Sequence, residues 1–263
     1  MHVRSTESLK RRTGHHLNHT VQDYFGSGIP GIPTTLGNAK AFHRQGSPVQ
    51  VTALVTKPAT ESLQQRKRRL RAEMRRRRRA LSPLQQRCAA RALHALVLRS
   101  ALFRFSRRIA FTLARDGEID PMPLLQTALR RGKACYLPVM NRLGEDRLSF
   151  RRWLPGQRLM KGAWGIPEPR LAKACAPRFL SLVLLPLVAF DADGHRLGMG
   201  RGYYDRSFAF KQRAGARRPA LLGLAHECQR VEHLEVASWD VPLEGIVTDR
   251  HWYRGDAAAT RRA

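Results

Sequence analysis

The sequence predicts an α/β fold, an open and mostly parallel doubly wound sheet with helices on both faces. Two observations lead to this prediction. Short apolar runs alternate with helical segments from residue 108 onwards, and the runs are continuously apolar, as in FLSLVLLPLVAF at 179–190. Strands that are covered by helices on both faces of a parallel sheet have this composition. The 263 residues are enough for one or two domains with a substantial core.

The first 60 residues differ from the rest of the chain. Turn-forming and polar residues dominate there, as in GSGIPGIPTTLGN, and the apolar residues follow neither a helical nor a strand period. We expect residues 1–60 to form a disordered, low-order N-terminal extension, or to reflect a start codon assigned too far upstream. A single α/β catalytic domain is expected over 61–256, followed by a flexible tail at 257–263.

Two helices are predicted next. Leu63, Leu70, Met74 and Leu81 fall on one face of the first helix, whose other positions are almost all basic. The second helix opens at 82–85 with Ser as N-cap, Pro at the first helical position and Gln completing a capping box. Strands are then expected in the apolar runs 108–113, 133–140, 148–154, 179–190, 219–226 and 244–249, with helices over 121–132 and 203–215.

Charge and cysteine usage limit the class of protein. The chain has 48 Lys and Arg against 20 Asp and Glu, a formal net charge of +28, which suggests nucleic acid or phosphorylated small molecules as partners. The four cysteines form no C-x-x-C pair, which argues against a zinc knuckle and favours reduced thiols. The longest apolar run is too short to span a bilayer and contains Pro186, so we expect a cytoplasmic protein without a membrane segment.

A glycine-rich loop carries the clearest chemical signal. After the predicted strand and a tight turn at Asp193-Gly194, three alternate glycines at 198, 200 and 202 lead into the expected helix. Glycines allow backbone N–H groups to approach an anion, and a helix N-terminus favours negative charge, so phosphate is the expected ligand. Arg196 and Arg201 supply positive charge, and Asp205 either partners the helix dipole or holds Mg²⁺. The spacing matches neither the Walker nor the Rossmann motif.

The whole segment 190–205, F-D-x-x-G-x-R-L-G-x-G-x-G-Y-Y-D, resembles the signature of the 5-formyltetrahydrofolate cyclo-ligase family, also called methenyltetrahydrofolate synthetases. Other family elements follow in the expected order: K-x-x-L-R at 67–71, E-I-D at 118–120, W-G-I-P-E-P at 164–169, and W-D with G-I-V-T over 239–248. The resemblance covers residues 66–254, nearly three quarters of the chain. One departure is Pro121, where the family usually has Thr, which removes a hydroxyl and a backbone donor near the expected folate pocket.

The resemblance implies a fold like that of the NagB/RpiA/CoA-transferase group and a monomeric enzyme. It implies ATP- and Mg²⁺-dependent cyclisation of 5-formyltetrahydrofolate to 5,10-methenyltetrahydrofolate, with release of ADP and phosphate. In the family's mechanism the formyl oxygen attacks the γ-phosphate, N10 closes on the resulting iminium phosphate, and phosphate leaves. Positioning and charge neutralisation, here by Lys67, Arg71 and Arg196, then do most of the work, and no nucleophilic side chain is required.

The family's site residues transfer onto matching positions of this sequence. The resemblance implies ATP binding by Lys67, Arg68, Arg69, Leu70, Arg71, Arg196, Leu197, Gly198, Met199, Gly200, Arg201, Gly202, Tyr203 and Tyr204. It implies folate binding by Leu113, Glu118, Trp164, Gly200, Arg201, Gly202 and Tyr203. It also implies that Asp205 and Asp240 bind the Mg²⁺.

Each of these positions also has a plain structural interpretation. Lys67 and Arg71 lie on one helix face that could simply be solvated, and Asp240 could cap a loop. Glu118 could be a first-turn helix acid, while Leu113, Trp164 and Tyr203 could belong to the core. Two other functions stay open: a nucleic-acid-binding protein that uses the Arg-rich helix 66–79 non-specifically, and a sugar-phosphate isomerase-like protein of similar architecture. No role is assigned to the run Arg75–Arg79.

Overall fold

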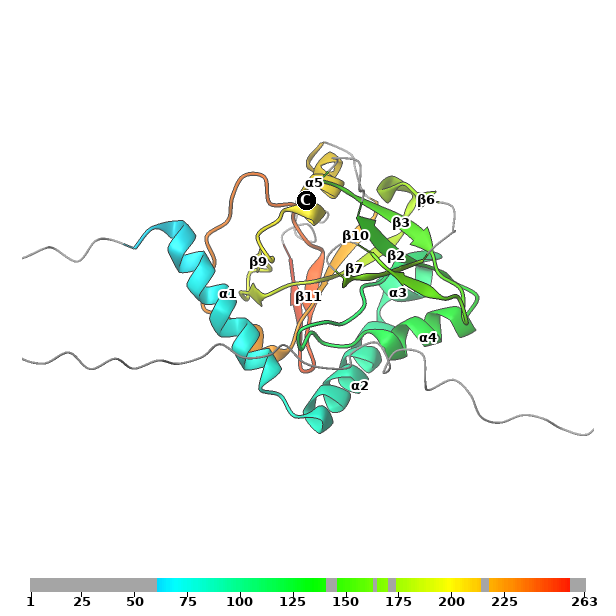
Figure 1. Cartoon of the computed structure of the whole chain (residues 1–263), viewed down its shortest axis with the longest axis horizontal. Helices are drawn as coiled ribbons and strands as arrows, with labels where there is room; N and C mark the ends of the chain where they lie inside the picture. Colours follow the sequence, from blue (N-terminus) through cyan, green and yellow to red (C-terminus); the bar gives the residue numbers. More distant parts are fainter. Residues whose placement is uncertain (1–60, 141–145, 163–164, 170–173, 214–217, 256–263) are drawn as a thin grey trace, which may run out of the picture. The chain divides into compact units, whose positions relative to one another are not determined.

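The computed structural model describes residues 61–140, 146–162, 165–169, 174–213 and 218–255, all within the unit Pro58–Ala263 (Figure 1). The expected N-terminal extension at 1–60 and the tail at 257–263 lie outside these residues. The helices are α1 (Leu63–Arg79), α2 (Pro83–Arg99), α3 (Ala101–Phe105), α4 (Met122–Arg130) and α5 (Tyr203–Phe208), with 3₁₀ turns η3 (Pro177–Phe179), η4 (Ala209–Gln212) and η5 (Glu227–Gln229).

The strands are β1 (Arg108–Ala110), β2 (Ala134–Met140), β3 (Leu148–Arg152), β4 (Leu159–Lys161), β5 (Pro167–Pro169), β6 (Ala174–Cys175), β7 (Leu182–Pro186), β8 (Ala189–Phe190), β9 (Arg196–Leu197), β10 (Ala220–Leu224), β11 (Gly245–Val247) and β12 (Trp252–Arg254). Eight of them form one sheet in the order β12-β11-β10-β7-β1-β2-β3-β6. The neighbours from β11 to β2 are parallel, whereas β12 and β3 pair antiparallel at the two sides. The prediction of an open, mostly parallel sheet is therefore confirmed.

Alternate residues of the central strands point to two separate cores. On one face, Leu182 and Leu184 of β7 pack with residues of α2 and α4, including Leu93 and Leu124. On the other face, Val183 and Leu185 pack in the cluster that contains Phe208 of α5. Figure 1 shows α2, α3 and α4 together on one side of the sheet and α5 on the opposite side. Both faces are covered, as the continuously apolar strands require.

Both long helices begin with a capping box. The hydroxyls of Ser62 and Ser82 each accept a hydrogen bond from the backbone N–H three residues later, and the backbone N–H of each serine donates to the side-chain oxygen of Gln65 or Gln85. The sequence predicted the second of these boxes but not the first. Neither helix, nor any other in the described part of the chain, is long and apolar enough to cross a membrane.

All the predicted strands are shorter in the structure, and two of them differ most from the prediction. The strand expected over 108–113 is assigned only to β1, although the Phe111 N–H still donates to Tyr136 O. The apolar run 179–190 does not form one strand, because the chain leaves the sheet after Pro186. The next carbonyl, Leu187 O, accepts hydrogen bonds from the side chains of Arg78 and Gln229 instead of from a neighbouring strand. The residues after it form the β8–β9 hairpin.

Candidate active site

The β8–β9 hairpin is fixed by a buried carboxylate. Asp191 is completely buried, and it accepts hydrogen bonds from the N–H and Nδ1 of His195 at 3.0 and 2.8 Å and from Leu234 N–H at 3.0 Å. Ligand atoms of Asp191, Asp193 and His233 lie within 4.8 Å of one another. Because the Asp191 carboxylate already accepts three hydrogen bonds, we interpret it as a residue that stabilises the hairpin and not as a metal ligand.

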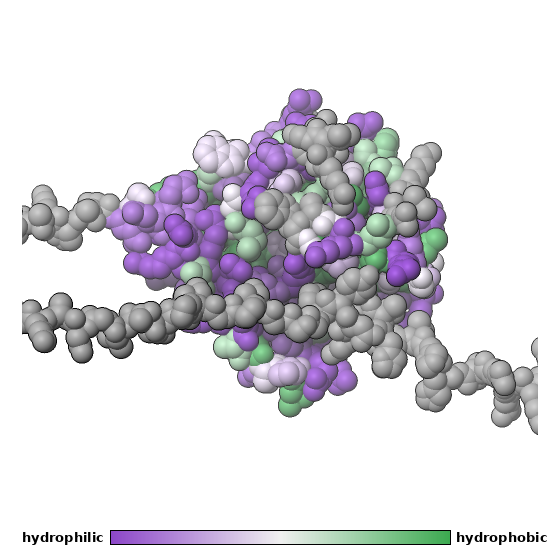
Figure 2. Space-filling model, in the orientation of Figure 1, coloured by the Kyte–Doolittle hydropathy of each residue, from purple (hydrophilic) through white to green (hydrophobic). Residues whose placement is uncertain are grey.

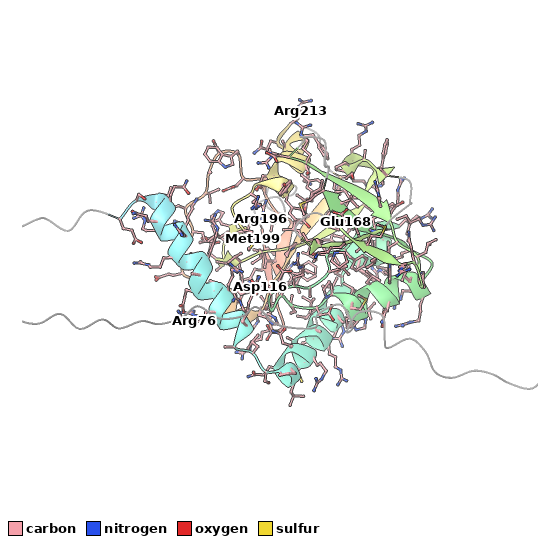
Figure 3. The ribbon with its side chains drawn as sticks, viewed as in Figure 1. Arg76, Asp116, Glu168, Arg196, Met199 and Arg213 are labelled. Atoms are coloured by element: carbon pink, nitrogen blue, oxygen red, sulfur yellow. The ribbon has the colours of Figure 1, made fainter. Side chains whose placement is uncertain are left out.

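The glycine loop follows this hairpin and lies against α1. Arg71 Nε donates to Gly198 O at 2.8 Å. Gly200 has a φ of +92°, and a Cβ there would lie 3.2 Å from the Arg71 guanidinium carbon, so a glycine permits the close approach. Burial of the guanidinium lowers the pKa of Arg71 from its ordinary value. Figure 3 shows Arg196 and Met199 on this segment, next to α1. The two regions that the resemblance assigns to ATP are thus in contact.

The helix after the loop is shorter than expected. The prediction placed a helix over 203–215, but α5 ends at Phe208 and a 3₁₀ turn follows. Gly202 occupies the N-cap with a φ of +63°, and no side chain caps the helix. Six residues provide only a small dipole, so the positive charge near the loop comes mainly from arginine side chains.

One backbone group connects the Asp205 side chain to the segment that contains Asp240. The Val241 N–H donates to Asp205 Oδ1 at 3.2 Å, and the same oxygen is ion-paired with the Arg196 guanidinium. Asp240 Oδ2 accepts a hydrogen bond from Ala237 N–H at 2.9 Å. In the described part of the chain the second oxygen of each carboxylate accepts no hydrogen bond. Two available carboxylate oxygens on adjoining segments fit a hard divalent cation.

The other predicted residues of α1 differ in exposure. Lys67 is half-buried on the same face as Arg71, whereas Arg68 and Arg69 are exposed, and Arg69 pairs with Glu61 at 3.1 Å. Leu70 packs against a small core that includes Leu197 of the hairpin. The structure therefore brings Arg71 and Leu70 to the loop, and it directs Arg68 and Arg69 away from it.

Glu118, the predicted folate residue, lies on the segment that follows β1. Its side chain is only 15% exposed, with Oε2 accepting from Arg115 N–H at 3.2 Å and Oε1 lying 3.5 Å from Arg78 Nη2. Burial raises the pKa of Glu118, and Arg78 acts in the opposite direction. Burial also raises the pKa of Tyr204, with the Glu118 charge as a second cause, so the two side chains are electrostatic neighbours. The charge of Glu118 thus acts on the residue that follows Tyr203 at the end of the glycine loop.

The remaining folate residues are more varied. Leu113 is half-buried and packs on the core under α2 and α4. Tyr203 is half-buried, and the Arg206 guanidinium lies 5.4 Å from the centre of its ring. Trp164 lies outside the described residues. At its neighbour Gly165, a Cβ would lie 3.7 Å from Lys161 Cε and 3.9 Å from Arg115 Nη2.

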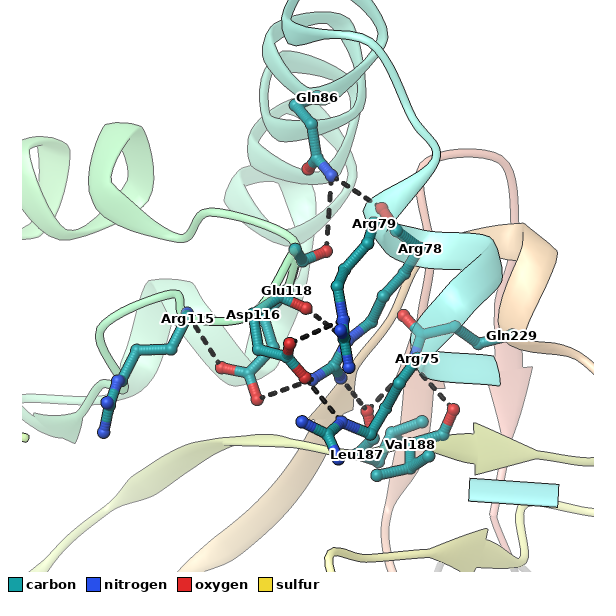
Figure 4. Close-up of polar contacts among 11 residues, drawn as sticks. Arg75, Arg78, Arg79, Gln86, Arg115, Asp116, Glu118, Leu187, Val188 and Gln229 are labelled. Carbon is teal, nitrogen blue, oxygen red and sulfur yellow. Dashed lines mark hydrogen bonds and ion pairs between the residues drawn. The ribbon is translucent and has the colours of Figure 1, made fainter. Parts of the chain in front are cut away.

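Sequence reasoning missed a cluster around Asp116. Arg75 and Arg79 pair with its carboxylate at 2.6 and 2.7 Å, and Arg78 Nη2 pairs with it at 3.0 Å (Figure 4). The available signal was position: Arg78 follows Met74 by four residues and so lies on the apolar face of α1. The other arginines of the run, Arg76 and Arg77, both pair with Glu73.

Comparison with known proteins identifies the family of this chain. The model of the 5-formyltetrahydrofolate cyclo-ligase family matches residues 63–249. The chain belongs to this family. The 5-formyltetrahydrofolate cyclo-ligase of Escherichia coli K12 is 37% identical over 177 residues, 66% of this chain and 96% of that protein. The enzyme of the same name from Haemophilus influenzae is 36% identical over 185 residues, 70% of this chain and 97% of that one.

Solved structures agree with the assignment to the cyclo-ligase family. The Aquifex aeolicus 5,10-methenyltetrahydrofolate synthetase matches with a TM-score of 0.61 and 30% identity, covering 72% of this chain and 92% of that one. The Mycoplasma pneumoniae synthetase matches with a TM-score of 0.55 at 22% identity over 70% and 99% of the two chains, and supports the fold alone. The region matched by the cyclo-ligase family model contains α1, the glycine loop, Glu118 and both metal-site candidates.

Proposed function

We propose that this chain converts 5-formyltetrahydrofolate into 5,10-methenyltetrahydrofolate with hydrolysis of ATP to ADP and phosphate. Besides membership of the cyclo-ligase family, one observation carries the proposal. Arg71 of α1 donates to the glycine loop at Gly198 O, and the Glu118 charge helps to raise the pKa of Tyr204, which directly follows that loop. A nucleotide on the loop and a folate on Glu118 would therefore occupy one site, as direct phosphoryl transfer between them requires.

In the proposed reaction the formyl oxygen attacks the γ-phosphorus and ADP leaves, which turns a poor leaving group into a phosphate ester. N10 then attacks the activated carbon and loses its proton. The carbon–oxygen bond breaks, and inorganic phosphate departs with the former formyl oxygen. The protein has to align the three reacting groups and offset negative charge on the transferred phosphoryl group.

The residues of the loop suit this task. Arg71 and the half-buried Lys67 bring positive charge to the loop from α1, and Arg201 adds charge from the loop itself. The exposed backbone at Gly198 and Gly200 can approach phosphate oxygens without interference from a Cβ. Asp205 and Asp240 would hold Mg²⁺, which when bound neutralises phosphate charge. Arg196 keeps Asp205 in position through their ion pair.

The test is the appearance of methenyltetrahydrofolate absorbance from 5-formyltetrahydrofolate, with and without MgATP. The wild-type chain should form product only with both Mg²⁺ and ATP. Asp205→Asn should reduce kcat/KM about a hundredfold, the usual size of losing one charge-stabilising group. Asp193→Asn, which changes an exposed carboxylate in the β8–β9 hairpin, is the matched control and should behave like wild type. Product formation without ATP, or no product from folded wild-type protein, would contradict the proposal.

The ion pairs of α1 do not favour the alternative of nucleic-acid binding. All five arginines of the run 75–79 pair with Glu73 or Asp116. Figure 2 shows a hydrophilic surface over α1, but part of this charge is already compensated within the protein. Arginines bind the phosphates of nucleic acids when their charge is not already neutralised by carboxylates of the protein. The ion pairs with Glu73 and Asp116 therefore lower the expected affinity for nucleic acid.

A further inference from the structure

Arg78 is a buried cation at the C-terminal end of α1. Its side chain is 1% exposed, and Nε donates to Asp116 O at 2.8 Å while Nη1 donates to Leu187 O at 3.2 Å. The Nη2 atom pairs with Asp116 Oδ2 at 3.0 Å and lies 3.5 Å from Glu118 Oε1. Figure 4 shows this single guanidinium reaching the segment that follows β1 and the segment that follows β7.

The segment that Arg78 holds contains an unusual turn. Asp116 has a φ of +53°, the only positive value outside glycine in the described residues, and Gly117 follows with +74°. A Cβ at Gly117 would lie 3.0 Å from Arg78 O, so α1 packs directly on this turn. Gln86 Nε2 closes the contact from α2 by donating to Arg78 O and to Gly117 O, at 3.1 and 3.3 Å. Glu118 follows this turn directly, so the turn sets the path of its backbone.

Four ionisable groups face the Glu118 carboxylate. Arg78 comes from α1, Arg115 and Asp116 come from the same segment as Glu118, and Tyr204 comes from α5. Arg78 contacts the carboxylate through its guanidinium, whereas Arg115 does so through its backbone N–H. Unlike Glu118, Asp116 is also ion-paired with two further arginines, Arg75 and Arg79. The loss of Arg78 would leave Asp116 well compensated but would remove the guanidinium in contact with Glu118.

We propose that Arg78 is a positioning residue for folate binding, which keeps the Glu118 carboxylate charged and aimed into the site. The proposal rests on the proposed function, because Glu118 contacts folate only if that function holds. It also explains why one arginine of an otherwise exposed run is buried. A Lys at this position could keep the charge, but its single ammonium group could not donate at the same time to the acceptors on Asp116 and Leu187 that the planar guanidinium reaches.

The test compares the full-length wild type with Arg78→Gln and Arg78→Lys. The quantity measured is kcat/KM for 5-formyltetrahydrofolate at saturating MgATP, from pH 5.5 to 8.5. Without Arg78 the acidic limb of the profile should move to higher pH, because the burial of Glu118 is then opposed by Arg115 alone and no longer by the guanidinium that contacts the carboxylate. Each unit of movement corresponds to about a tenfold loss at pH 6 and little loss at pH 8. The loss should appear in KM for folate, with KM for ATP unchanged.

Arg79→Gln is the matched control, since Arg79 pairs with Asp116 but has no contact with Glu118. Its profile should match the wild type. If Arg78→Gln does not fold, Arg78→Lys should still show part of the shift, because a shorter cation on Asp116 falls short of Glu118. The double variant Arg78→Gln/Glu118→Gln should be no weaker than Glu118→Gln alone. A wild-type profile in folded Arg78 variants, an equal loss at every pH, or the same shift in Arg79→Gln would overturn the proposal. An inactive wild type would overturn the proposed function itself, and this proposal with it.

Discussion

The middle and the C-terminal end of α1 use arginine in opposite ways. Arg71 and Arg78 are seven residues apart and so lie two turns apart on the same side of the helix. Arg71 makes one hydrogen bond, to the carbonyl of an exposed glycine, and lies at the loop where phosphate is expected. Arg78 is buried and serves the backbone and carboxylates of two segments. The first arginine is available to a ligand, whereas the second is used by the protein.

This difference follows from what each end of the helix packs against. The middle of α1 lies on the β8–β9 hairpin, and the glycine loop that follows this hairpin leaves Arg71 partly exposed. The C-terminal half lies on the Asp116–Gly117 turn, which surrounds the guanidinium with oxygen acceptors. One helix thus connects the expected nucleotide and folate regions, and substitutions at Arg71 and Arg78 should separate activity from stability.

The largest effect is expected from Arg78→Ala. Removing a buried guanidinium leaves Leu187 O and Asp116 O with fewer donors, so the free energy of unfolding should fall by about 3 kcal/mol. Urea denaturation followed by circular dichroism measures this change. Arg75→Ala, a partly exposed partner of the same Asp116, is the control and should cost less than half as much. Equal losses in the two variants would mean that burial does not distinguish these arginines.

Arg71→Gln should have the opposite signature. Because Arg71 is partly exposed and has one hydrogen bond, the free energy of unfolding should change by less than about 1 kcal/mol. The KM for ATP should rise about ten- to a hundredfold, since a charge-assisted contact with phosphate is lost. Steady-state kinetics with ATP varied at saturating folate measures the effect. A stability loss as large as that of Arg78→Ala would contradict the division of roles along α1.

Glu118→Gln should trade function for stability. The pKa of Glu118 is raised in the folded state, so the folded protein holds this proton more tightly than the unfolded chain does. Wild-type stability should therefore fall as pH rises from the ordinary glutamate pKa through the raised one. At pH 7 the Gln variant escapes this cost and should be more stable than the wild type, while folate affinity falls. Thermal unfolding at pH 4.5 and pH 7 tests the sign, since the advantage should shrink at the lower pH.

The sequence predicted those features that depend on local pattern. Continuously apolar strands, the Ser82 capping box and the alternate glycines each appear where the pattern placed them. The sequence did not predict that Pro186 ends a strand, because that depends on Arg78 and Gln229 taking the next carbonyls. Such partners come from segments distant in the chain, and neither period nor spacing reveals them.

The candidate site divides in the same way. The family motifs located Arg71, Glu118 and the glycine loop, and the structure brings Arg71 into contact with the loop. The Arg75–Arg79 run received no role, because a row of arginines usually indicates a solvated surface. The position of Arg78 within the helical period did indicate a different role. Arg78 lies on the apolar face of α1, where a buried guanidinium needs buried acceptors, and Asp116 and Glu118 provide them.

The smallest effects are expected on the outer face of α1, where Arg76 and Arg77 both pair with Glu73. These pairs are exposed, so replacing both arginines by Gln should change the free energy of unfolding by less than about 0.5 kcal/mol and leave catalysis unchanged. If this face bound nucleic acid, the plot of the logarithm of the association constant for duplex DNA against the logarithm of the salt concentration would have a negative slope. That slope would become about two units less steep in the double variant. We expect an unchanged slope, because Glu73 already occupies both guanidinium groups. A slope that is less steep by this amount would instead mean that Arg76 and Arg77 bind a polyanion. Only the inner face of α1 would then serve catalysis.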